Sequence, residues 1–313
     1  MPVTITGGIS FSGGVSMVGA PPSDATAGWF GSGSIDRITF ATDTATASSR
    51  GPLNSSTIVL GATGNLTYGW FGGGTGGGAP VYSYSLVQRI TYATDTATAS
   101  LRGSLAVSTR TVAASGNTTD GWFGGGYYGP AGSATIISVV SRITYATDTT
   151  TASQRGPLSL ARTKIASVSD NSAYSWFAGG YPGNLSTVDR ITYATDTATA
   201  SVRGPLASGR YSISGMGNST YGWFVGGLTY ISSVNRIDYS NDTTTASVRG
   251  PLSAGKGSTG AAGNSTDGWV SGGNSPNVST VDRITYATDT ATATARGPLS
   301  STKYGIAGVA GLQ

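Results

Sequence analysis

The sequence has 313 residues, of which 49 are glycine and only 10% are charged, and its net charge is +4 at pH 7. This composition excludes a helix-rich cytosolic enzyme, and a hydrophobic content of 38% argues against disorder. Cysteine is absent, which excludes disulfides and thiolate metal sites, and the modest, evenly spread charge disfavours a nucleic-acid-binding protein.

The N-terminal segment, residues 1–24, lies outside the pattern that fills the rest of the chain. It lacks the basic start and continuous apolar run of a signal peptide, and no stretch of about 18 apolar residues occurs in the sequence. We therefore expect neither a secretion signal nor membrane insertion. The alternation in VTITGGISFSGGVSM suits a strand. This strand either attaches the protein to a partner or lies as a tail against the domain.

The remaining residues, 25–313, repeat one phrase, RITYATDTATAS, with small variations. Its copies start 46–53 residues apart, at Arg37, Arg89, Arg142, Arg190, Arg236 and Arg283. Before each copy stands one tryptophan, and glycines follow it, at Trp29, Trp70, Trp122, Trp176, Trp223 and Trp269. A period near 50 made of short β-type segments, without helical periodicity, is typical of propeller blades. The sequence therefore predicts an all-β fold, a six-bladed β-propeller with four-stranded antiparallel blades.

One repeat shows how a blade divides into strands. Strand patterns cover residues 162–170, 174–180, 187–193 and 198–204, with turn residues between them. The tryptophan of the second strand can bury 150–250 Å², roughly 4–6 kcal/mol at about 25 cal/mol per Å². We expect these tryptophans to be structural anchors between blades. A glycine-rich phosphate loop is disfavoured because no helix follows the glycines.

The ends of the chain complement each other. The first copy begins with a second strand, at AGWFGSG, whereas the last copy ends with a lone first strand, STKYGIAGVAGLQ. Pairing of the two would hide open sheet edges. We therefore expect the C-terminal strand to complete the N-terminal blade and close the ring.

The two faces of such a propeller carry different sequences. Turns after the first and third strands are nearly identical, and each third-strand turn contains one aspartate: Asp43, Asp95, Asp148, Asp196, Asp242 and Asp289. We expect these carboxylates to hydrogen-bond their own turn backbone. A calcium ring is disfavoured because each turn offers a single carboxylate and the chain has no glutamate. We expect no metal and no cofactor.

The loops after the second and fourth strands, which form what we call the variable face, differ between copies. The two longest follow Trp70 and Trp122 and carry the candidate binding residues Tyr82, Tyr84, Tyr127 and Tyr128. Five cations stand at the starts of the innermost strands, at the same end of the propeller: Arg110, Arg162, Arg210, Lys256 and Lys303. They form either a positive ring that attracts an acidic ligand at the channel mouth, or salt bridges and backbone caps between blades.

Catalytic chemistry is disfavoured by the inventory of side chains. The chain has no histidine, cysteine or glutamate. Glycosidases need two carboxylates in different environments, and nucleophilic triads need a base. We therefore expect a protein that is not an enzyme.

The repeats resemble the Kelch repeat, a β-propeller family, over roughly residues 25–313. The resemblance is carried by a glycine pair closing the second strand, as at Gly179 and Gly180, a third strand ending in Tyr193, and a basic residue opening the next repeat, as at Arg210. Kelch repeats usually carry a tryptophan in the fourth strand, where this chain has alanine and valine. This resemblance implies a propeller.

The uniform phrase YATDTATASVRGPL, with GWFGGG and a surface rich in Ser, Thr and Gly, also resembles propeller-type structural proteins of tailed bacteriophages, particularly cyanophages. The resemblance implies a non-enzymatic virion component, tail-associated or on the capsid surface, assembled in the host cytoplasm and present in several copies. Residues 1–24 would contact other virion proteins, and the variable face a host-surface glycan or protein. The alternatives are an intracellular Kelch-type protein-interaction module and a carbohydrate-binding lectin.

Overall fold

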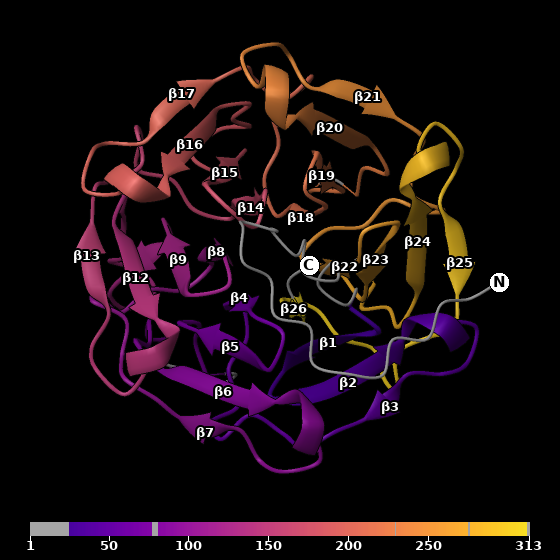
Figure 1. The fold of residues 1–313 in the computed structure, drawn as a ribbon, viewed down its shortest axis with the longest axis horizontal. Coiled ribbons are helices and arrows are strands. Elements are labelled where there is room, and N and C mark those ends of the chain that lie inside the picture. The colour runs from indigo at the N-terminus through magenta and orange to yellow at the C-terminus, as the bar shows by residue number, and fades with distance from the viewer. Residues whose placement is uncertain (1–24, 77–80, 229, 275, 312–313) are drawn as a thin grey trace, which may run out of the picture.

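The computed structural model describes residues 25–76, 81–228, 230–274 and 276–311. The expected attachment segment, residues 1–24, lies outside the described residues. The described chain confirms an all-β fold of six four-stranded antiparallel sheets. Figure 1 shows them as blades around a central axis, with first strands innermost and fourth strands at the rim.

The blades follow the chain, and blade 1 combines both ends. Blade 1 contains β26 (Ala307–Ala310), β1 (Ala27–Ser32), β2 (Ser34–Thr39) and β3 (Ser48–Ser49). Blade 2 contains β4 (Gly61–Gly64), β5 (Tyr68–Gly72), β6 (Val87–Thr91) and β7 (Ser100–Leu101). Blade 3 contains β8 (Ala113–Gly116), β9 (Asp120–Gly124), β12 (Val140–Thr144) and β13 (Ser153–Arg155).

The second half of the ring repeats this plan. Blade 4 contains β14 (Ala166–Ser169), β15 (Tyr174–Ala178), β16 (Val188–Thr192) and β17 (Ser201–Arg203). Blade 5 contains β18 (Ser214–Gly217), β19 (Tyr221–Val225), β20 (Val234–Asp238) and β21 (Ser247–Arg249). Blade 6 contains β22 (Gly260–Gly263), β23 (Asp267–Ser271), β24 (Val281–Thr285) and β25 (Thr294–Arg296).

Short elements complete the inventory. A separate hairpin pairs β10 (Tyr127–Tyr128) with β11 (Thr135–Ile136) in the long loop of blade 3. One 3₁₀ turn follows the third strand of each blade: η1 (Phe40–Thr42), η2 (Tyr92–Thr94), η3 (Tyr145–Thr147), η4 (Tyr193–Thr195), η5 (Tyr239–Asn241) and η6 (Tyr286–Thr288). Among the described residues, no helix has the length and apolar character needed to cross a membrane.

The closure of the ring is confirmed. In blade 1, β26 pairs antiparallel with β1, with Trp29 opposite Val309 and Gly28 opposite Ala310. The yellow β26 thus lies beside the indigo β1 in Figure 1. This pairing hides the inner edge of β1, which would otherwise be open.

The core lies mainly between the blades. Each tryptophan stacks on an aromatic ring of the next blade, as Trp122 does on Tyr193 with ring centroids 3.9 Å apart. The circle ends where Trp269 of blade 6 stacks on Phe40 of blade 1 at 3.8 Å. The indoles of Trp70, Trp122, Trp176, Trp223 and Trp269 are essentially inaccessible to water. Such stacked aromatic contacts add about 0.5–1.5 kcal/mol to the energy of burial.

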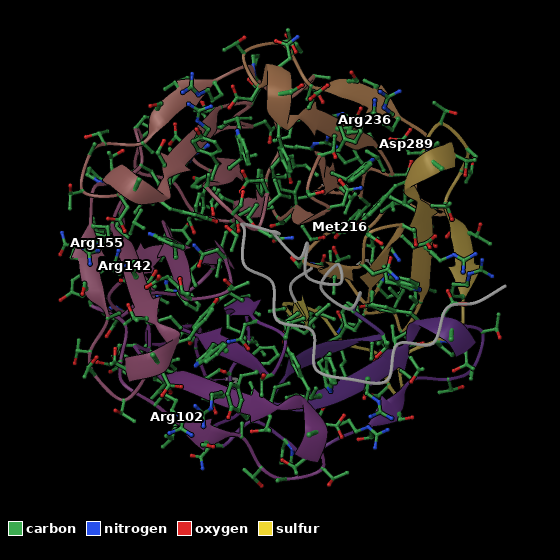
Figure 2. The ribbon with its side chains drawn as sticks, in the orientation of Figure 1. Arg102, Arg142, Arg155, Met216, Arg236 and Asp289 are labelled. Atoms are coloured by element: carbon green, nitrogen blue, oxygen red, sulfur yellow. The ribbon has the colours of Figure 1, made fainter. Side chains whose placement is uncertain are left out.

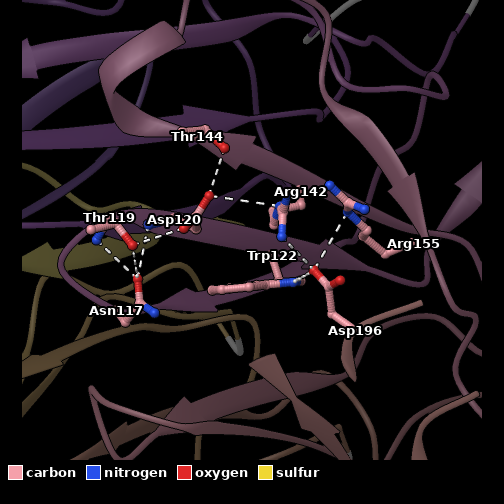
Figure 3. A network of polar contacts seen from close by, with 8 residues as sticks. All are labelled: Asn117, Thr119, Asp120, Trp122, Arg142, Thr144, Arg155 and Asp196. Carbon is pink, nitrogen blue, oxygen red and sulfur yellow. Dashed lines mark hydrogen bonds and ion pairs between the residues drawn. The ribbon is translucent and has the colours of Figure 1, made fainter. Parts of the chain in front are cut away.

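The six repeated aspartates join the same blade junctions, so the expectation that they cap their own turns is wrong. The Oδ2 atom of Asp196 in blade 4 accepts a 2.9 Å hydrogen bond from Nε1 of Trp122 in blade 3. It also lies 3.1 Å from Nη1 of Arg142 and 3.4 Å from Nε of Arg155. Figure 3 shows the three side chains converging on this carboxylate, Trp122 and Arg142 by hydrogen bonds and Arg155 by an ion pair. The repeated arginines and aspartates therefore cross-link neighbouring blades.

Equivalent contacts recur around the ring. Trp29 and Arg37 of blade 1 reach Asp95 of blade 2, and Trp269 and Arg283 of blade 6 reach Asp43 of blade 1. In Figure 2 the labelled Arg102, Arg142 and Arg155 lie toward the rim, whereas Met216 lies near the axis. The ion pairs therefore form an outer belt around the ring.

A narrow channel follows the axis. The innermost strands line it with small residues such as Ala62, Ser115 and Gly215, and its compartments have volumes of about 90–110 Å³. Near the variable face, one residue of each blade has φ between 54° and 59°: Val59, Thr111, Lys164, Ser212, Ser258 and Gly305. We call these six residues the collar.

The collar is a closed circle of backbone hydrogen bonds. The amide of each collar residue donates to the carbonyl of the collar residue in the preceding blade, at 2.6–3.2 Å, and the amide of Val59 donates to Gly305. Left-handed backbone disfavours side chains other than glycine by roughly 1–2 kcal/mol. The collar bonds therefore hold five residues in a conformation that only Gly305 adopts without strain.

Candidate binding surface on the variable face

The two long loops of the variable face are tied to each other. The Oγ of Ser83, from the loop between β5 and β6, donates to the carbonyls of Tyr127 and Gly129 at 2.8 and 3.1 Å. The amide of Ala131 donates to the carbonyl of Val81 at 2.8 Å. The loops of blades 2 and 3 therefore form one surface, which we call the loop platform (residues 81–86 and 127–136).

The side chain of Arg110 is hydrogen-bonded to both loops of the loop platform. Its Nη1 donates to Oγ of Ser83 at 2.8 Å and to the carbonyl of Gly129 at 2.6 Å. Its guanidinium also lies over the ring of Tyr127, 5.1 Å from the centroid. Arg110 is buried, and this burial lowers the pKa of its guanidinium. The structure thus makes Arg110 an internal clip rather than an exposed cation.

The tyrosines predicted from the long loops differ in exposure. Tyr82 and Tyr128 have 50% and 52% of their surface exposed. Tyr127 is partly buried, which raises the pKa of its hydroxyl. Tyr84 is also partly buried, and its carbonyl accepts a hydrogen bond from the amide of Thr109. Tyr82 and Tyr128 are therefore the outward-facing members of this group.

The other four predicted cations are buried, so of the two alternatives the structure shows ion pairs and backbone contacts in place of an exposed positive ring, and these ion pairs lie within a blade, not between blades. Arg162, Arg210, Lys256 and Lys303 are at most 7% exposed. Three of them pair with a buried aspartate of the third strand: Arg162 with Asp189 at 3.0 Å, Lys256 with Asp282 at 3.1 Å and Lys303 with Asp36 at 3.1 Å. Their charges are thus compensated inside the protein.

Arg110 does not belong to this set. Arg162 stands four residues before Ala166, the first residue of β14, whereas Arg110 stands three residues before Ala113, the first residue of β8. Thr109 is therefore the equivalent of Arg162. In the sequence, the number of residues between the basic residue and the first alanine of the innermost strand indicates this difference between Arg110 and Arg162.

Arg210 has a buried charge without a carboxylate partner. Its Nη1 donates to the carbonyl of Ser233 at 2.9 Å, and its Nη2 has no hydrogen-bond partner among the described residues. Asn235 occupies the place that Asp189 takes beside Arg162. Burial lowers the pKa of the Arg210 guanidinium to about 10.

We predict that Asn235→Asp stabilises the protein. The new carboxylate gives Arg210 the ion pair that Arg162 has, and it keeps the 3.0 Å hydrogen bond that Asn235 accepts from the amide of Ala207. We expect a gain of about 1–2 kcal/mol, because charged hydrogen bonds contribute about that much. The melting temperature measured by calorimetry should rise by about 2–4 °C. An unchanged or lower value would contradict the pairing.

Sequence reasoning missed a second group of side chains, which stand on other loops of the variable face. Tyr181, Tyr230 and Tyr304 are 39–47% exposed. Tyr181 and Tyr211 meet edge to face, with centroids 5.8 Å apart, and Lys164 Nζ lies 5.9 and 5.2 Å from their centroids. These residues come from short loops that resemble the other copies in length, so no length signal marked them.

The described residues contain no cluster of side chains with the composition of a metal site. The carboxylates near the variable face, Asp36, Asp189 and Asp282, are fully buried and hydrogen-bonded. Within the described part of the chain, this surface therefore offers tyrosines, hydroxyls and the partly exposed Lys164.

These features define a six-bladed propeller with a tyrosine-rich face. No protein-family model matches the sequence, and no curated protein matches it. Among solved structures, the structure of YjhT is similar, with a TM-score of 0.67 and 10% sequence identity over 90% of this chain and 100% of that one. At this identity the similarity shows the fold alone.

Proposed function

We propose that this chain is a non-enzymatic, Kelch-like component of a tailed bacteriophage virion, tail-associated or on the capsid surface, and that its variable face contacts a protein or the host surface. The observation that carries the binding role is the gathering of exposed tyrosines on one face: Tyr82, Tyr128, Tyr181, Tyr230 and Tyr304. Tyrosine is enriched in protein interfaces because its ring supplies contact area and its hydroxyl a hydrogen bond.

The internal repeat supports a role for these tyrosines outside the scaffold. The structure builds each blade on the same tryptophan, arginine and aspartate contacts. Tyr82 and Tyr128 take no part in those contacts, and they stand in loops that are longer than the corresponding loops of the other blades. They also differ in position from blade to blade, which disfavours a lectin with one equivalent sugar site in each blade.

The virion assignment is supported by the sequence resemblance to phage propellers. A non-enzymatic role is supported by the absence of histidine, cysteine and glutamate from the whole sequence. In this proposal residues 1–24 attach the propeller to other virion proteins, and several copies are present in each particle. The expected location is the assembled virion.

The test uses particles of the phage that encodes this chain. We expect mass spectrometry of purified virions to find the protein in stoichiometric amount. The double variant Tyr82→Ser with Tyr128→Ser should reduce adsorption to host cells, or incorporation into particles, about tenfold. The matched control is Val248→Ser, because Val248 is 64% exposed at the rim, on β21. Absence of the protein from virions would refute the assignment, and equal behaviour of both variants would refute the role of the loop platform.

A further inference from the structure

Lys164 is a cation without a counter-charge. Most lysines and arginines of the chain form ion pairs with aspartate. Lys164 has neither an ion pair nor a side-chain hydrogen bond among the described residues, and burial lowers the pKa of its amine. Two tyrosine rings, those of Tyr181 and Tyr211, flank its Nζ atom. An anion at this position would compensate the charge.

The fold does not require a lysine at this position. Lys164 belongs to the collar, and the other blades build the same hydrogen-bonded backbone with valine, threonine, serine or glycine. Gly305 forms the same collar hydrogen bonds without any side chain, so the long charged side chain of Lys164 is not needed for the fold. Comparison of the six blades therefore shows that the fold does not depend on the charge or the length of this side chain.

Lys164 also lines a small cavity at the channel mouth. This cavity has a volume of about 90 Å³, and Ser212 and Ser258 line it as well. The hydroxyls of both serines make no hydrogen bond to the described residues, so they are available as donors. This volume is well above the roughly 10–15 Å³ that a single water molecule needs. The cavity therefore has room for a carboxylate group.

We propose that the channel mouth binds the carboxylate of an acidic side chain from a protein partner, with Lys164 as its counter-charge and the hydroxyls of Ser212 and Ser258 as donors. Tyr181 and Tyr211 hold the amine in place and contact the partner's backbone. This inference rests on the proposed binding role of the variable face and names the chemistry of the partner. Its test uses the isolated protein, so its failure leaves the virion assignment and the loop platform untouched.

The experiment measures binding of two peptides by calorimetry at low ionic strength. The acidic peptide has the sequence SESESE, and the neutral control has the sequence SQSQSQ. We expect the acidic peptide to bind and the neutral one to bind at least tenfold more weakly. Lys164→Ser should weaken the acidic peptide tenfold or more, because it copies the serine of blades 5 and 6 and leaves the fold intact. Lys164→Arg should restore most of the affinity.

A second readout locates the peptide. The chain has three lysines, and Lys256 and Lys303 are buried. Acetylation of Lys164, followed by mass spectrometry, should slow at least fivefold in the presence of SESESE. Equal affinity of the wild type and Lys164→Ser for this peptide would overturn the proposal. So would binding of trigalacturonate in place of the peptide, because the site would then take an acidic saccharide.

Discussion

Replacing Asp196 with alanine should lower the free energy of unfolding by about 3 kcal/mol. The change leaves the Nε1 donor of Trp122 buried without its acceptor. It also removes the carboxylate paired with Arg155 and one of the two carboxylates paired with Arg142, which keeps Asp120 at 3.7 Å. Loss of one partner of a buried ion pair costs about 3–5 kcal/mol. The lower end applies because the two arginine side chains keep 26% and 19% of their surface exposed. The melting temperature should fall by about 6 °C.

Two further variants separate the charge from the hydrogen bond. Asp196→Asn keeps an acceptor for Trp122 and removes only the charge, so about half of the loss should remain. Asp238→Ala is the matched control, because among the described residues the side chain of Asp238 bonds only within its own turn, to Ser240. We expect it to cost less than about 1 kcal/mol. Equal losses for Asp196→Ala and Asp238→Ala would show that the junction carboxylates do not cross-link the blades.

Removal of residues 306–313 should lower the melting temperature by more than about 10 °C or abolish soluble expression. This truncation deletes β26 and the buried side chains of Ile306 and Val309, each contributing roughly 1.5–3 kcal/mol. It also opens the inner edge of β1 to pairing with other chains. Calorimetry and size-exclusion chromatography measure the two effects. A truncated protein that remains monomeric with an unchanged melting temperature would show that the closing strand is dispensable.

A circular permutant tests whether folding requires only the presence of β26 or also its position at the C-terminus of the chain. It starts at Ser301, joins Ala310 to Ala27 through Asn-Ser-Thr, and ends at Ser300. The linker copies residues 218–220 between β18 and β19, and its threonine replaces Thr26, whose carbonyl accepts a hydrogen bond from the amide of Phe40. We expect this protein to fold with a melting temperature within about 5 °C of the wild type. Failure to fold would mean that the order of the strands in the chain matters beyond their contacts.

The fold could be predicted from the sequence because the same contacts recur in every blade. One tryptophan phrase and one RITY phrase per blade gave the number of blades, and the incomplete copies at the two ends indicated the closing strand. In blade 4 the observed strands fall inside the predicted ranges but are shorter. The third strand, for example, ends at Thr192 because Tyr193 begins η4. The period thus indicated the pairing but not the point where each strand ends.

The side-chain partners could not be predicted because a repeat does not show which blade a contact reaches. Asp196 stands in a turn motif that suits local hydrogen bonds, yet its partners lie in the preceding blade. Likewise the basic residues before the innermost strands are similar in sequence but differ in their contacts. Arg110 stands one position closer to its strand than Arg162 does. Arg110 therefore hydrogen-bonds the two long loops, whereas Arg162 forms a buried ion pair with Asp189. The collar places Lys164 at the channel mouth, with Tyr181 beside it, and no motif in the sequence indicates this arrangement.

The closed collar has a mechanical consequence. The six collar hydrogen bonds form a closed ring around the axis, because the chain of donors and acceptors returns to Val59. No collar residue therefore stands at an open end. Moving one blade outward breaks two collar hydrogen bonds, because each collar residue is bonded to both neighbouring blades. The left-handed backbone fixes the direction of each amide and carbonyl, so the broken bonds are not replaced. Tension applied to a single loop of the variable face is therefore shared around the whole circumference.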